Sequence, residues 1–145
     1  MADVQMTSYK ISRLEMYNDL KNSQGVDVRN WFELEVTFDM ENELAVAALT
    51  EHLKMTKEPS DFGIDLTLIG IFSFTGVNSD ELKREVHIKC YDELFPFAGQ
   101  IISLLAMNSG MSGFLLNKNP LTMEKVNFGS KPEKDKNDKI IEFRG

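Results

Sequence analysis

Apolar and polar residues alternate along residues 31–40, which is the clearest strand pattern in the chain. The apolar positions are Phe32, Leu34, Val36, Phe38 and Met40. The polar positions between them are Glu33, Glu35, Thr37 and Asp39. Strict alternation with aromatic and β-branched residues predicts a strand with one packed face and one solvated face.

A second long strand is predicted for residues 62–75. One of its faces would carry six large apolar side chains, those of Phe62, Ile64, Leu66, Leu68, Phe72 and Phe74. The other face is apolar at its centre and polar only toward its ends. Gly70 lies in the middle, where a glycine often marks a bulge or a close approach of another backbone.

Two further segments are ambiguous. Residues 7–20 mix apolar and polar positions with a spacing that suits a strand only in part. Residues 43–57 begin with an alanine-rich run, which favours a helix, and then alternate like a strand. Local propensity alone favours the helix by a small margin.

The pattern also predicts a short helix and a long one. Residues 78–88 begin with Asn78 and Glu81 at the spacing of a capping box. The long helix would span residues 92–108. Pro96 is tolerated only near a first turn, so it would mark the start of this helix, and Gly110 follows its end.

The long helix is apolar nearly all round, with only Gln100, Ser103 and Asn108 as a polar strip. A helix of this kind is buried on more than one side. Because a short chain's own sheet covers one side, we expect self-association, with the helix buried wholly in its own subunit as the alternative. The expected interface residues are Phe95, Ile102, Leu105 and Met107. The apolar run is interrupted and shorter than the roughly 20 residues of a membrane span, so no membrane insertion is expected.

Composition predicts where the domain ends and in which compartment the protein is found. The 145 residues suffice for one domain, predicted as residues 1–129, and the charged, proline-containing run that follows predicts a flexible tail over 130–145. Net charge is −7, which argues against nucleic acid as a partner. Cys90 is the only cysteine and no signal peptide is evident, so we expect a cytoplasmic protein.

Catalytic chemistry has little support in the sequence. There are two histidines, and no phosphate-binding loop, metal-spaced cluster or nucleophile elbow. His87 and Cys90 form an i, i+3 pair, for which a buried cysteine and a surface histidine are the favoured interpretation. We therefore predict neither an enzyme nor a cofactor. The row of Glu33, Glu35 and Asp39 is expected to be a solvated strand face.

An apolar loop after the long helix is more informative. Met111, Phe114, Leu115 and Leu116 need not be apolar if they only connect elements, because loops usually run over the surface. Two interpretations stay open and are compatible. The loop completes the core, or it is an adaptable binding surface.

Several segments in order resemble SecB, the bacterial export chaperone family. They are residues 70–76 (Gly-Ile-Phe-Ser-Phe-Thr-Gly), Cys90, residues 94–98 (Leu-Phe-Pro-Phe-Ala), Ile101-Ile102, Asn119-Pro120 and residues 126–128 (Val-Asn-Phe). The resemblance runs from about Asp65 to Phe128, and the N-terminal half matches only by pattern.

The resemblance implies an α+β fold, an antiparallel sheet of about four strands with a long and a short helix on one face. It implies that residues 43–57 are strand, which we adopt against their alanine content. It also implies a dimer or a dimer of dimers with the long helices between two sheets. The implied function is an ATP-independent holding chaperone for protein export, which binds unfolded or nascent polypeptides in hydrophobic grooves.

The resemblance also places sites on this chain. The expected client groove comprises Phe72, Phe74, Met111, Phe114, Leu115, Leu116, Leu121 and Met123. Asp19 and Asp65 fall at acidic positions through which export members bind SecA, whereas a further such position falls near Asn22 and Ser23. Two alternatives stay open: a SecB-like chaperone that protects an antitoxin of a toxin–antitoxin system, and a carrier of a small hydrophobic ligand.

Overall fold

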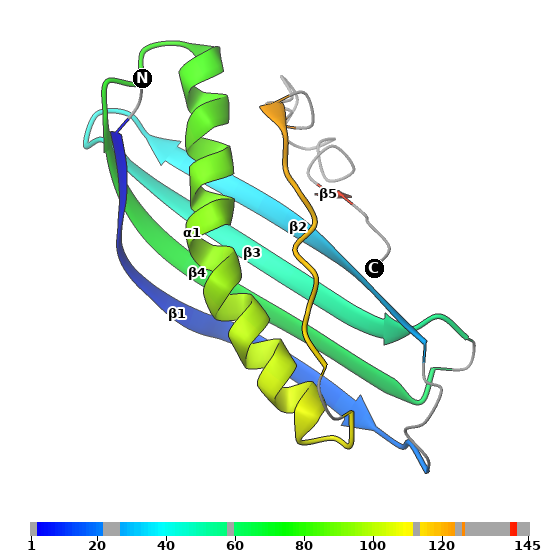
Figure 1. The fold of residues 1–145 in the computed structure, drawn as a ribbon. Coiled ribbons are helices and arrows are strands. Elements are labelled where there is room, and N and C mark those ends of the chain that lie inside the picture. The colour runs from blue at the N-terminus through cyan, green and yellow to red at the C-terminus, as the bar shows by residue number, and fades with distance from the viewer. Residues whose placement is uncertain are drawn as a thin grey trace.

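The computed structural model describes residues 3–21, 27–57, 60–111, 114–123 and 126, and the backbone of 140–141. Four long strands form one antiparallel sheet: β1 (Asp3–Asn18), β2 (Val28–Asp39), β3 (Leu44–Met55) and β4 (Phe62–Thr75). A single helix, α1 (Asp80–Met107), lies across one face of the sheet (Figure 1). The strand order is β1-β4-β3-β2-β5, where β5 is the short Ile140–Ile141. The α+β class and the four-stranded sheet are therefore confirmed.

The two strands predicted from alternation are present with the expected packed faces. In β4, the six apolar side chains of the predicted face are all buried. In β2, Phe32 and Leu34 are buried and Val36 and Phe38 are half-buried on the same side. These side chains form one core with the buried face of α1.

The alanine-rich segment is a strand throughout, as the family resemblance implied and local propensity did not. Ala45 and Ala47 are fully buried on the helix side of β3. Ala47 pairs with Gly70 of β4. A Cβ atom added at Gly70 would lie 2.9 Å from the Leu94 Cδ2 atom of α1. Small residues are therefore needed here because the helix approaches the sheet closely, and this packing outweighs helix propensity.

The prediction of two helices is wrong, because residues 80–107 form one continuous helix of 28 residues. Its N-cap is Ser79, whose hydroxyl accepts a hydrogen bond from the Leu82 N–H at 3.2 Å, and not Asn78. Pro96 lies inside the helix and not at its start. A row of buried residues at every fourth position runs through the predicted break: Val86, Cys90, Leu94, Ala98, Ile102 and Ala106.

That row explains why the helix continues through Pro96. An interior proline removes one helical hydrogen bond and costs roughly 3 kcal/mol, whereas one fully buried Leu or Ile side chain contributes about 1.5–3 kcal/mol. Pro96 is exposed on the side away from the sheet, so its ring does not disturb the packed face. Packing of several apolar side chains therefore outweighs the local cost.

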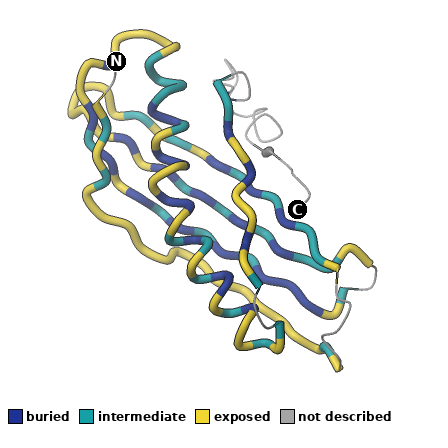
Figure 2. Tube along the Cα trace, in the orientation of Figure 1, coloured by how far each residue is buried: buried dark blue, intermediate teal, exposed yellow. Residues whose placement is uncertain are grey.

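Strand β1 forms an edge of the sheet and is exposed along most of its length (Figure 2). Its pairing with β4 shifts register between Met6 and Ser8 and again between Ile11 and Arg13. These bulges put Tyr9, Ile11, Leu14 and Met16 opposite buried-face positions of β4, although their spacing in the sequence is irregular. The irregular spacing is the reason why alternation alone left residues 7–20 ambiguous.

The C-terminal region is described in part. Ile140 and Ile141 pair with Glu33 and Phe32 at the free edge of β2. The rest of the predicted tail and residues 127–129 lie outside the described residues. The boundary at residue 129 and the flexible tail remain predictions.

Candidate functional site

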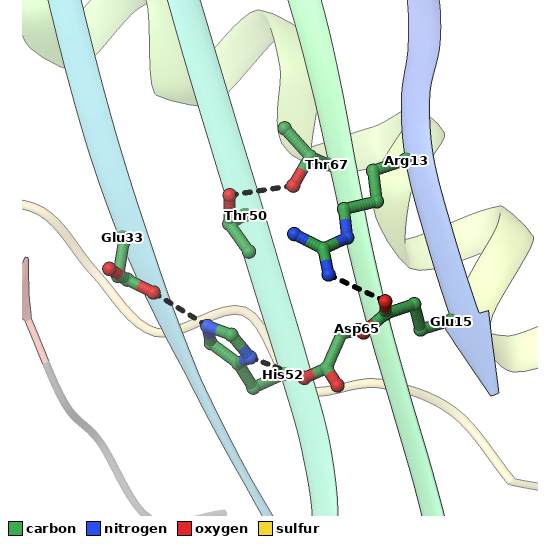
Figure 3. A pocket seen from close by; sticks show the side chains of 7 residues that line it. All are labelled: Arg13, Glu15, Glu33, Thr50, His52, Asp65 and Thr67. Atoms are coloured by element: carbon green, nitrogen blue, oxygen red, sulfur yellow. Dashed lines mark hydrogen bonds and ion pairs between the residues drawn. The ribbon is translucent and has the colours of Figure 1, made fainter. Parts of the chain in front are cut away.

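A polar pocket lies on the sheet face opposite α1 (Figure 3). Its volume is about 320 Å³ and it crosses all four long strands. The lining residues are Arg13 and Glu15 of β1, Glu33 of β2, Thr50 and His52 of β3, and Asp65 and Thr67 of β4. Antiparallel register brings them together, since Thr50 pairs with Thr67 and His52 with Asp65.

The charged groups of this pocket contact one another. The His52 ring contacts Glu33 Oε1 through Nε2 at 2.7 Å and Asp65 Oδ1 through Nδ1 at 2.5 Å. Burial works to raise the pKa of Asp65, but hydrogen bonds and charge from His52 and Lys54 outweigh it, so the pKa lies below its ordinary value. Arg13 pairs with Glu15 at 2.5 Å, and the Thr50 and Thr67 hydroxyls are 2.8 Å apart.

This arrangement is a satisfied ion-pair network. Both ring nitrogens of His52 are occupied by carboxylates, which leaves no free base to act on a substrate. Among the described residues, no group of three His, Cys, Asp or Glu side chains is suited to a metal ion. The grouping of Glu33, His52 and Asp65 was not anticipated, because it depends on the register of three strands.

The two acidic positions proposed for SecA lie in different surroundings. Asp65 is paired with His52 and with Lys54 Nζ, at 3.0 Å from the lysine. Asp19 follows the end of β1 and is exposed, and its backbone N–H donates to the Asp61 carbonyl at 2.7 Å. Asp19 is therefore the more accessible of the two carboxylates.

The helix side of the sheet has a contrasting apolar surface, which we call the β1–α1 patch. It consists of large exposed side chains on β1 and near the end of α1: Tyr9, Ile11, Leu14, Met16, Leu104 and Met107. Tyr9 stacks on Phe97 of α1 with ring centroids 4.4 Å apart, and Asn18 Nδ2 donates to the Ser109 carbonyl at 3.4 Å. These two contacts show that β1 runs beside the second half of the helix. Exposed apolar side chains gathered on one side of a protein are typical of an interaction surface, so the β1–α1 patch is a candidate for one.

The interface residues predicted from the helix divide into two groups. Phe95 and Ile102 are buried in the chain's own core. Leu105 is half-buried and Met107 is exposed. The outward side of the helix includes Leu104, 55% exposed, which the sequence reasoning did not select.

The residues of the predicted client groove also divide by burial. Phe72, Phe74, Leu116 and Leu121 belong to the core, so their side chains are closed to a client in this structure. Met111, Phe114 and Met123 are half-buried. Leu115 is 75% exposed, more than any other large apolar side chain among the described residues.

Most of these groove residues lie on or next to an extended segment of residues 114–123, which we call the strap. The strap runs beside α1 and above β2 and β3 (Figure 1). Asn30 Nδ2 of β2 donates to the Asn117 carbonyl at 3.1 Å, and Asn119 Nδ2 donates to the Asn30 carbonyl at 3.4 Å. From α1, the Tyr91 hydroxyl donates to the Asn119 carbonyl, and Ser103 Oγ accepts from the Leu116 N–H at 3.0 Å.

The body residues that hold the strap were missed by sequence reasoning. Asn30, Tyr91 and Ser103 are ordinary residues of a strand and a helix, and no local motif links them to a segment 13 to 87 positions away. Below them lies Glu51 of β3, whose side chain is buried and whose two carboxyl oxygens have no hydrogen-bond partner among the described residues. Its sequence neighbours predicted only an alternating strand.

Cys90 belongs to the core and is not a nucleophile in this structure. Burial, with a smaller contribution from the nearby Glu93 charge, raises the pKa of its thiol to about 12. A thiol is reactive as the thiolate, so this environment is that of an inert cysteine. His87 is buried as well, and not on the surface as predicted, and it stacks on Phe38.

Comparison with known proteins identifies the family. The model of the SecB family, preprotein translocase subunit SecB, matches residues 19–134. The chain belongs to the SecB family, and a chaperone role, not an enzymatic one, follows from that membership. No curated protein sequence matches the chain. No helix among the described residues is long and apolar enough to cross a membrane.

A solved structure of a SecB-like chaperone shares the fold. The chain resembles the Mycobacterium tuberculosis Rv1957 SecB-like chaperone in complex with a ChAD peptide from the Rv1956 HigA1 antitoxin, with a TM-score of 0.65 and 16% identity. That match covers 82% of this chain and 92% of the other. A protein of unknown function from Streptococcus agalactiae matches with a TM-score of 0.49 and 10% identity, over 81% of this chain and 99% of the other.

Proposed function

We propose that the protein is an ATP-independent holding chaperone that binds unfolded polypeptides along the strap. The observation that carries this proposal is the exposure of Leu115 on an extended segment whose neighbours Met111, Phe114 and Met123 are only half-buried. In a family of chaperones, exposed apolar side chains beside a long helix suit an apolar segment of another chain. Methionine side chains adapt to varied partners, as a holding chaperone requires.

The other surfaces support this choice over the alternatives. The pocket on the opposite sheet face is polar and its charges are paired, so it does not suit a small hydrophobic ligand. The same pairing leaves Asp65 less available to a translocase. For the export role we therefore propose Asp19 as the acidic contact for SecA.

The second candidate client is an antitoxin. The similar Mycobacterium tuberculosis chaperone is described in complex with an antitoxin peptide, so a single peptide segment is a suitable client for this fold. Both roles use the same binding chemistry and differ in partner. Binding of purified SecA at equilibrium, lost in Asp19→Lys, supports export, and absence of SecA binding favours the antitoxin role.

Client binding is tested by fluorescence anisotropy with a labelled, reduced and alkylated protein that cannot fold. We expect binding at micromolar concentration or tighter, unchanged by ATP, and no binding of the same protein in its native form. Leu115→Ser is expected to weaken binding without loss of stability, because the side chain is 75% exposed. Leu44→Ser, at an exposed position of β3 away from the strap, is the matched control. Equal binding of native and unfolded forms would contradict the proposal.

We also propose that the β1–α1 patch is the self-association surface. Six large exposed apolar side chains lie there beside the free edge of β1, and an uncovered strand edge pairs readily with a second copy. This assignment places the partner on the outward side of α1, at Leu104 and Met107. It leaves the strap, on the other side of α1, free for clients.

A further inference from the structure

We propose that the strap occupies the seat of the client, so that an extended client segment binds by displacing the chain's own residues 114–123. This inference rests on the proposed function, in which the exposed Leu115 first captures the client, and adds a second step in which the captured segment takes the place of the strap. The seat is the part of α1 and β2 to which the strap is hydrogen-bonded. The residues that hold an extended chain there are Asn30, Tyr91 and Ser103.

The hydrogen bonds of the seat are directed at main-chain atoms of the strap. Asn30 and Tyr91 donate to the carbonyls of residues 117 and 119, and Ser103 accepts from the N–H of residue 116. Every polypeptide offers these groups, apart from the missing N–H of proline. The seat therefore recognises an extended chain largely without regard to its sequence, which is what a general chaperone requires.

The polar contacts that depend on the strap's own side chains come from Asn119 and Lys118. Asn119 Nδ2 donates to the Asn30 carbonyl at 3.4 Å. Lys118 Nζ pairs with Asp92 at 2.6 Å, but both side chains are about half exposed, so solvent screens the pair. Lys118 Nζ also lies 5.3 Å from the centroid of the Tyr91 ring. Three side-chain contacts, of which the Lys118–Asp92 pair is screened, therefore distinguish the strap from a foreign segment with similar apolar residues.

Buried and exposed side chains are interspersed along the strap. Leu116, Asn119 and Leu121 point into the body and are buried, whereas Leu115, Lys118 and Pro120 are exposed. The strap pairs with the body through side chains of Asn30, Tyr91 and Ser103, and not through a β-ladder. A client with apolar residues at similar spacing would bury its side chains at the same places.

The floor of the seat contains an uncompensated polar group. Glu51 pairs in the sheet with Phe32, and Phe32 stacks on Tyr91 with ring centroids 4.4 Å apart. The carboxyl oxygens of Glu51 have no hydrogen-bond partner among the described residues while the strap is in place. A buried unpaired carboxyl is unfavourable, so this part of the core is less stable than an apolar equivalent would be.

The test measures client affinity in two variants. Asn119→Ala removes the strap's own side-chain hydrogen bond and leaves the main-chain contacts, so the strap competes less well. We expect roughly two- to tenfold tighter binding of the reduced and alkylated client, the range for loss of one hydrogen bond. Leu44→Ser, at an exposed position on the opposite sheet face, is the control, and we expect its client affinity to equal that of the parent. Unchanged affinity in a folded Asn119→Ala variant would overturn the inference.

Hydrogen exchange of the unaltered protein gives a second readout that needs no variant. The Leu116 amide, which is bonded to Ser103, is expected to lose protection when the client saturates the protein. Client binding with full protection of this amide overturns the inference and leaves the proposed function intact. Failure of any client to bind overturns the proposed function first. Loss of protection with rising protein concentration alone would assign the seat to a second copy and also contradict the inference.

Discussion

Glu51 is a carboxyl group with 1% exposure in the core beneath Tyr91. Burial raises its pKa well above the ordinary value of 4.5, so the native protein holds this proton where the unfolded chain has released it. Above about pH 4.5 the native state therefore binds more protons than the unfolded state. The free energy of unfolding then falls as pH rises, by up to about 1.4 kcal/mol per pH unit for one group.

We expect Glu51→Gln to remove this dependence. Denaturant unfolding between pH 2 and 8 should give a flatter profile above pH 4.5 in the variant, with a gain in stability over the parent that grows with pH. Asp65→Asn is the control, because Asp65 changes the free energy of unfolding with pH in the opposite direction. The pKa of Asp65 is lowered, so its contribution is present at neutral pH and is lost as the pH falls below its unfolded value of about 3.8. Parallel profiles of parent and Glu51→Gln would contradict the account.

Single residues were the least predictable part of the molecule. Glu33 was interpreted as part of a solvated row and Asp65 as a docking position, yet both contact the ring of His52. Their meeting depends on β2, β3 and β4 lying in one particular register, which local patterns do not contain. Likewise, nothing in the neighbours of Ser103 indicates that its hydroxyl receives the N–H of Leu116.

Elements were predicted better where one pattern dominated. β2 and β4 followed from alternation, because each has one face in the core. β3 required the family resemblance, since its alanines serve the close approach of α1 and not a helix. The break predicted near Pro96 was wrong because local rules on proline do not include the buried row from Val86 to Ala106.

Pro96 provides a test of this account of α1. Pro96→Ala restores an N–H that can donate to the carbonyl four residues earlier, and the position is exposed. We expect the free energy of unfolding to rise by about 1–3 kcal/mol, measured by denaturant titration. Gln100→Ala, one turn later on the exposed side, should change it by less than about 0.5 kcal/mol. A decrease for Pro96→Ala would show that the proline is needed for a local geometry that the row does not explain.

At the scale of the whole molecule, SecB family membership was predicted from residues 65–128 and is confirmed. The oligomeric state stays a prediction, and the structure changes which residues test it. Ile102 is buried in its own subunit, so a charge there would disturb folding and not only association. Leu104 is exposed on the outward side of α1, so a charge there tests association without disturbing the core.

We expect the parent protein to sediment as a dimer or tetramer at micromolar concentration. Leu104→Asp should shift it toward monomer, because a charge enclosed by a second copy costs several kcal/mol, while the thermal midpoint measured at low concentration changes little. Leu44→Asp places the same charge on an exposed leucine of the opposite sheet face and should leave the oligomer intact. A monomeric parent would show that the β1–α1 patch has another partner.

The most direct test of the central claim is a light-scattering titration of an aggregating client. A protein diluted from denaturant aggregates on its own, and we expect stoichiometric amounts of this chain to suppress the scattering without ATP. Suppression should saturate near one client per oligomer and should be weaker with Leu115→Ser than with Leu44→Ser. Scattering that persists at several-fold molar excess of the chain would contradict the assignment as a holding chaperone.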